Sequence, residues 1–129
     1  MSRAIAALAS LFALAAAPSM AQDASGNAEA GQKVFTQCRA CHTIDKGGRA
    51  TVGPNLFGII GRTAGTFEGF RYSPPMQAKR AENFVWTEEN LRAYIRDPKA
   101  VVPRGSMSYV GLKNEQQLND LMAYLRAQH

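Results

Sequence analysis

The sequence predicts a small all-α domain with three to four main helices and long loops rich in glycine and proline. Two observations carry this prediction. Apolar residues recur at helical spacing behind helix-capping residues in several short segments, and the alternating apolar pattern of β-strands is missing. The chain has 129 residues, including 11 glycines and 6 prolines, which is enough for one domain.

Three or four helices are expected, each beginning after a residue suited to cap a helix N-terminus. These residues are Asn27, Ser73, Thr87 and Asn114. The first helix is expected to run on into residues 38–42, the second to end near Arg80 and the third at Asp97-Pro98. The last helix has one apolar face, formed by Leu118, Leu121, Met122 and Leu125. Residues 45–72 and 101–111 are expected to be irregular.

The first 21 residues have the three-part pattern of a secretory signal. Arg3 precedes an apolar run from Ala4 to Ala17, and Ser19-Met20-Ala21 has small residues at the two positions that a signal peptidase reads. The run is shorter than the ~20 residues that a membrane-crossing helix needs, so an uncleaved anchor is the weaker alternative. We therefore expect cleavage after Ala21 and a single mature domain over residues 22–129.

The charge of the chain excludes one class of partner. The whole chain has a formal net charge of +5, and loss of Arg3 with the signal leaves 14 basic and 10 acidic residues, or +4. This modest basic excess favours acidic partners without identifying one. No run of basic residues exceeds two, so we expect no binding to nucleic acid.

Residues 38–42 carry the main chemical signal. Cys38-Arg39-Ala40-Cys41-His42 is a C-x-x-C-H string, the attachment pattern of c-type haem. Its spacing lets Cys38 and Cys41 reach the two vinyl groups on one edge of a porphyrin, while His42 reaches the iron. The alternatives are a redox disulfide, which favours a βαβ context, and a zinc site, which needs a fourth ligand. The sequence shows no βαβ pattern, and the string offers only three of the four ligands that zinc needs.

A second axial ligand is sought among one histidine and three methionines. His129 is at the extreme C-terminus, where chains fray, and Met122 belongs to the apolar face of the last helix. Met76 is either core or surface. Met107 lies in an aperiodic loop with no helical face to claim it, which favours a ligand over the packing role that a lone methionine usually has. A large bound group also explains the long loop over residues 45–72, because loops of this length are usually functional.

In these features the chain resembles the class I cytochromes c, especially the bacterial cytochrome c2 and mitochondrial cytochrome c group. The resemblance covers roughly residues 29–126. Beyond the haem string, it rests on the ordered segments Val52-Gly53-Pro54-Asn55-Leu56, Gly61-Arg62, Gly69-Phe70-Arg71-Tyr72, Trp86, Tyr94, Asp97-Pro98-Lys99 and Met107. Four further residues match the family's contact between its first and last helices, namely Gly31, Phe35, Leu121 and Tyr124.

The resemblance implies a role for each matched residue around one covalent haem c. His42 would be the proximal ligand, oriented by the Pro54 carbonyl, and Met107 would be the distal ligand of the iron. Three residues would hydrogen-bond or pair with the haem propionates, namely Arg62, Tyr72 and Trp86. Tyr94 would lie near the Met107 sulfur. For each aromatic residue, simple core packing is the alternative.

The resemblance also implies the function. We expect a monomeric, periplasmic, one-electron carrier that is not an enzyme and is not embedded in a membrane. Its partners would be redox proteins that dock transiently at the exposed haem edge: a cytochrome bc1-type donor, a terminal oxidase, a reaction centre or a dehydrogenase. Two alternatives stay open, a fixed electron-entry subunit of a larger oxidoreductase and an open-site haem enzyme or sensor.

The chain departs from the family pattern around the expected distal ligand. It reads Pro103-Arg104-Gly105-Ser106-Met107 where the mitochondrial pattern is Pro-Gly-Thr-Lys-Met, so Arg104 occupies a glycine position. Gln37 and Ser106 also stand where the family has lysines around the exposed haem edge. This puts docking through a strong lysine ring in doubt.

Overall fold

Helices and long loops make up the part of the chain that the structure, a computed structural model, describes: residues 26–129. The helices are α1 (Ala28–Phe35), α2 (Pro74–Ala81), α3 (Glu88–Arg96), α4 (Pro98–Val101) and α5 (Glu115–Arg126). Within this range, the β-structure is one isolated bridge between Thr63 and Val85. The expected all-α fold class is therefore confirmed. The expected signal segment and its cleavage site lie outside the described residues.

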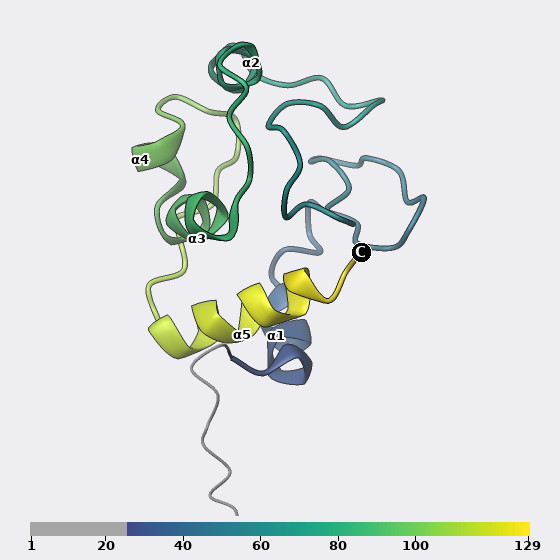
Figure 1. Cartoon of the computed structure of the whole chain (residues 1–129), viewed down its shortest axis with the longest axis vertical. Helices are drawn as coiled ribbons and strands as arrows, with labels where there is room; N and C mark the ends of the chain where they lie inside the picture. Colours follow the sequence, from purple (N-terminus) through teal and green to yellow (C-terminus); the bar gives the residue numbers. More distant parts are fainter. Residues whose placement is uncertain (1–25) are drawn as a thin grey trace, which may run out of the picture.

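The first and last helices, α1 and α5, pack against each other at one end of the molecule (Figure 1). Their closest approach is at Gly31, where an added Cβ would lie 1.9 Å from the Asp120 carbonyl oxygen. Next to this point, the rings of Phe35 and Tyr124 pack with their centroids 5.3 Å apart. Gly31 therefore lets the two helices meet at a distance that no larger residue permits.

Side-chain caps begin most helices as expected. Oxygens of Asn27, Thr87 and Asn114 accept hydrogen bonds from the backbone N–H three residues on, at 2.9, 3.1 and 2.9 Å. Ser73 makes no such bond, and α2 instead begins with two prolines, whose missing N–H groups cost nothing there. The apolar face expected in α5 is buried, with Met122 fully inaccessible.

The end of α1 differs from the expectation, because the helix stops at Phe35 and does not run into residues 38–42. The N–H groups of Gln37 and Cys38 donate to carbonyls three residues back, at 3.3 and 2.8 Å, which tightens the chain into turns. One helical turn returns inside the motif, where the His42 N–H donates to the Cys38 carbonyl at 2.9 Å. The motif therefore keeps helix-like spacing without being part of α1.

The short helix α4 was not expected from the sequence, which predicted an end to the third helix at Asp97-Pro98 and irregular chain from Val101. Asp97 ends α3 as predicted, but its carboxylate also accepts a hydrogen bond from the Ala100 N–H at 3.3 Å. With Pro98 at the first helical position, this cap starts a new four-residue helix at once. The Asp-Pro pair therefore both stops one helix and starts the next.

Asn55 organises the long loop opposite these helices. Its side chain is 2% exposed. Its Nδ2 donates to the Thr43 hydroxyl at 2.9 Å and to the Asp45 carbonyl at 3.0 Å. At the loop's outer edge, the Gly58 N–H donates to the Gln128 carbonyl at 2.7 Å, beside the C-terminus marked in Figure 1. The loop is thus tied both to the C-x-x-C-H segment and to the end of the chain.

The elements surround a central region from three directions. Figure 1 shows α2, α3 and α4 on one side, the loop that follows the C-x-x-C-H segment on the other, and the α1–α5 pair below. No helix among residues 26–129 is long and apolar enough to cross a membrane.

The backbone conformation of Arg104, three residues before Met107, leads to a prediction about stability. Its φ is +62°, a left-handed conformation that costs a non-glycine residue about 1–2 kcal/mol. Glycine loses about 0.5–1 kcal/mol more chain entropy on folding, so Arg104→Gly is expected to raise the free energy of unfolding by about 0.5–1 kcal/mol. Urea unfolding of the haem-loaded protein, followed by circular dichroism, measures this change.

Lys99→Gly is the control for that experiment, because it places glycine inside α4, where it is expected to lower the free energy of unfolding by about 1 kcal/mol. Destabilisation by Arg104→Gly would contradict the account, since it would mean that the arginine side chain contributes more than its backbone costs.

Candidate functional site

A cavity of about 290 Å³ lies in the central region. All nine residues singled out from the sequence line it: Cys38, Cys41, His42, Pro54, Arg62, Tyr72, Trp86, Tyr94 and Met107. Among the remaining lining residues, most are apolar, including Leu56, Ile59, Phe70, Leu91, Leu121 and Leu125. The fold thus brings together the whole set of predicted site residues, from segments far apart in sequence.

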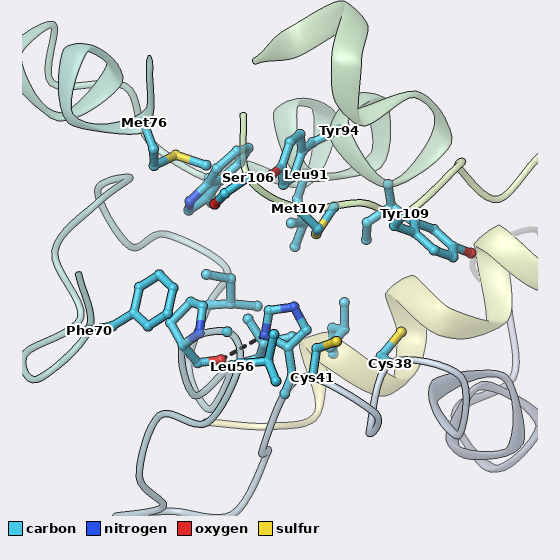
Figure 2. Close-up of a pocket in the computed structure, with 18 of the residues that line it drawn as sticks. Cys38, Cys41, Leu56, Phe70, Met76, Leu91, Tyr94, Ser106, Met107 and Tyr109 are labelled. Carbon is cyan, nitrogen blue, oxygen red and sulfur yellow. Dashed lines mark hydrogen bonds between the residues drawn. The ribbon is translucent and has the colours of Figure 1, made fainter. Parts of the chain in front are cut away.

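The His42 ring lies flat against the backbone at Gly53. A Cβ at Gly53 would be 2.5 Å from the ring carbon Cε1, so the ring needs a glycine there. Nδ1 donates to the Pro54 carbonyl at 2.7 Å (Figure 2, dashed line), as expected from the sequence. This bond assigns the proton to Nδ1 and leaves Nε2 with a free lone pair.

Burial lowers the pKa of His42 below its ordinary value, although the bond to the Pro54 carbonyl opposes the shift. The imidazole is therefore neutral at pH 7. A neutral imidazole with a free Nε2 is the form that binds a metal ion.

Cys38 and Cys41 lie side by side at one rim of the cavity, as Figure 2 shows. The turn that joins them is closed by the Cys41 N–H, which donates to the Cys38 carbonyl at 3.1 Å. Burial, and to a lesser extent the nearby Cys41, raises the pKa of the Cys38 thiol to about 11. Cys38 is thus protonated at neutral pH, unlike the low-pKa thiolate of a redox-active C-x-x-C pair.

Met107 faces Cys41 from the opposite side of the cavity, with Leu91 and Tyr94 close behind it (Figure 2). The Tyr94 ring stacks on Trp86, with centroids 4.8 Å apart, and burial raises the pKa of Tyr94 to about 12. Helix α3 thus provides an apolar wall behind the methionine. His129, by contrast, is exposed and outside the lining.

Three polar side chains reach the cavity with donors to spare. Arg62 donates to the carbonyls of Asn55, at 2.8 Å, and Phe57, which leaves other guanidinium N–H groups unused. The Tyr72 hydroxyl accepts from the Phe67 N–H at 3.0 Å and keeps its own proton to donate. Trp86 is 5% exposed, and its indole makes no hydrogen bond within residues 26–129.

Some lining residues could not be assigned from the sequence. Met76, which the sequence allowed to be either core or surface, projects toward the cavity from α2 (Figure 2). Phe70 and Leu56 come from the long loop, where no periodicity marks which apolar residues turn inward. Gln37 and Tyr109 also line the cavity, one directly before the C-x-x-C-H string and the other two residues after Met107. The apolar cluster Leu56–Ile60 was the one available signal, because such a cluster is unusual in an exposed loop.

This arrangement fits an iron porphyrin attached by thioethers. The walls are mostly apolar, and both cysteines lie at one rim. His42 directly follows Cys41, and Met107 faces Cys41 from the opposite side of the cavity. A zinc site is disfavoured, because no group of three or more His, Cys, Asp or Glu side chains within the described residues is placed to hold a metal ion.

The family model of cytochrome c matches residues 28–128. The chain belongs to the cytochrome c family. This cytochrome c is 48% identical over 118 residues to cytochrome c2 of Blastochloris viridis, covering 90% of this chain and 87% of the relative. It is 43% identical over 100 residues to cytochrome c-550 of Nitrobacter winogradskyi, covering 78% and 89%. Among solved structures, cytochrome cH from Methylobacterium extorquens matches with a TM-score of 0.70 and 33% identity, covering 78% of this chain and 98% of that one.

Family membership confirms the resemblance found in the sequence, the cytochrome c fold and the general function of a haem-bearing electron carrier. Cys38 and Cys41 supply the two cysteines that covalent attachment requires. The roles of individual residues around the haem are taken up below as proposals.

The cavity leads to a prediction for the protein without haem. In Cys38→Ala/Cys41→Ala, purified and checked by absorbance to be haem-free, apolar walls from α3, α5 and the long loop have nothing to pack against. We expect weak, non-cooperative unfolding in urea, followed by circular dichroism, beside a cooperative transition for the haem-loaded wild type. A cooperative transition in the haem-free variant would show that the protein core suffices, and would contradict this expectation.

Proposed function

We propose that this cytochrome c is a soluble one-electron carrier whose haem iron is ligated by His42 and Met107. One observation carries the proposal: the free Nε2 of His42 and the side chain of Met107 belong to opposite sides of one cavity that has both cysteines at its rim. When bound, haem supplies an iron that gains and loses a single electron. With both axial positions taken by side chains, no position remains for a substrate, which favours electron transfer over catalysis.

The two proposed ligands tune the iron differently. The hydrogen bond from Nδ1 to the Pro54 carbonyl fixes the orientation of His42 and increases electron donation from the ring. Met107 brings a soft thioether, which raises the reduction potential relative to a second nitrogen ligand. The apolar wall of Leu91 and Tyr94 excludes water from the methionine side, which also favours the ferrous state.

Arg62, Tyr72 and Trp86 are proposed to bind the haem propionates. A propionate that leaves water needs hydrogen-bond donors, and each of these side chains has one unused within the described chain. The support is that all three side chains line the same cavity as His42 and Met107.

The proposed setting is the periplasm, after removal of residues 1–21. Partners would dock transiently at the haem edge, where Cys38 and Tyr109 line the mouth of the cavity. These partners would be a bc1-type donor, an oxidase, a reaction centre or a dehydrogenase. The carrier itself would be a monomer. Support comes from the secretory pattern of the sequence and from the cytochrome c2 relatives that the chain matches over most of its length.

The weak ferric absorption band at about 700 nm, which reports methionine sulfur on haem iron, tests the ligand assignment. We expect this band in the wild type and its loss in Met107→Ala, whose ferrous form should then bind carbon monoxide readily. Met76→Leu removes the other methionine that lines the cavity, which belongs to α2, and the band is expected to survive it. A band that persists in Met107→Ala would assign the ligand to another methionine and contradict the assignment of Met107. No band in the haem-loaded wild type would favour an open-site enzyme or sensor.

A further inference from the structure

The residues around Met107 have few hydrogen bonds to the rest of the protein. We call residues 106–111 the distal segment. At its two ends, the Gly105 N–H donates to the Val102 carbonyl at 3.1 Å and the Leu112 N–H donates to the Ile95 carbonyl at 2.9 Å. Between them, within the described part of the chain, the backbone of the distal segment makes no hydrogen bond to another residue. Most of its restraint must therefore come from side chains.

One side-chain hydrogen bond ties the distal segment to the opposite side of the cavity. The Tyr109 hydroxyl donates to Gln37 Oε1 at 3.1 Å, across 72 positions of sequence. Among residues 26–129, no other side-chain hydrogen bond involves the segment. Gln37 directly precedes Cys38, so this bond links the segment that carries Met107 to the segment that carries the attachment cysteines.

Packing sets the direction of the Tyr109 hydroxyl. The ring is half-buried and packs against the hydrophobic core, while Gln37 is exposed. Figure 2 shows Tyr109 beside Met107, facing Cys38 across the cavity. Because the ring is already ordered, little additional side-chain entropy is lost on the tyrosine side when the bond forms.

We propose that Tyr109 and Gln37 form a clasp that holds Met107 in place, which makes them positioning residues for the distal ligand. The clasp rests on the proposed function, because it presumes that Met107 ligates the iron. Departure of the methionine requires the distal segment to swing away from the cavity mouth, and this movement breaks the Tyr109–Gln37 bond. The far end of the segment is anchored by the bond from the Leu112 N–H to the Ile95 carbonyl, and Gly111 packs so closely there that an added Cβ would lie 2.1 Å from the Arg96 carbonyl oxygen. Movement is therefore confined to the stretch that the clasp restrains.

The test is the rate at which an added ligand replaces Met107 in the ferric haem-loaded protein. Imidazole in saturating amounts captures the iron each time the methionine leaves. Loss of the band at about 700 nm measures the progress of this reaction. We expect Tyr109→Phe, which keeps the ring and removes the hydroxyl, to accelerate this loss about two- to tenfold, the range for one net hydrogen bond. Gln37→Leu should give the same acceleration.

Double substitution separates a shared bond from two independent effects. Because each single change removes the same bond, Tyr109→Phe/Gln37→Leu should be no faster than either alone. Gln37→Glu keeps an acceptor oxygen and is expected to stay near the wild-type rate. Val110→Ala changes a side chain that is 85% exposed in the same segment and serves as the matched control.

Two results would overturn the clasp: wild-type rates in both single variants, or accelerations that multiply in the double variant. These outcomes are distinct from failure of the proposed function, which would appear as the absence of the band in the wild type before any substitution is made.

Discussion

The cavity that receives the haem is the constraint on which the rest of the structure depends. Its walls come from the long loop, from α3 and from α5, and most of them are apolar. Direct helix packing joins α1 to α5 and α3 to both α4 and α5, whereas α2 and the long loop contribute residues to the cavity walls. A large apolar group bonded to the chain supplies the missing partner for these walls, which explains how a short chain with long loops acquires a fixed structure.

The two sides of the cavity are held with unequal strength. On the His42 side, Gly53 fits the ring, the Pro54 carbonyl fixes its tautomer, and the buried Asn55 anchors the loop behind it. On the Met107 side, the distal segment follows an arginine in a strained left-handed conformation, and its hydrogen bonding rests on Tyr109. The His42 side is thus held by several contacts within the protein, whereas the Met107 side would depend on the proposed bond of Met107 to the iron and on one hydrogen bond across the cavity.

Local signals in the sequence were sufficient for three of the four expected helix caps, Asn27, Thr87 and Asn114, and for the buried face of α5. Each of these features depends on neighbours within a turn or two. The end of α1 was missed because tight i−3 hydrogen bonds leave no mark in the spacing of residues. Met76, Phe70 and Tyr109 were missed as lining residues because their surroundings are set by distant parts of the chain, as in the 72-residue separation between Tyr109 and Gln37. The resemblance to a family, rather than periodicity, indicated the roles of Pro54, Arg62 and Tyr72.

A crystal structure of the haem-loaded protein in both the ferric and the ferrous state tests the central claim most directly. The account predicts thioether bonds to Cys38 and Cys41, with His42 Nε2 and the Met107 sulfur on the iron in both states and little movement of the distal segment between them. Water, or an open position, in place of the Met107 sulfur in either state would contradict it, because the protein would then present a site for substrate rather than a closed electron carrier.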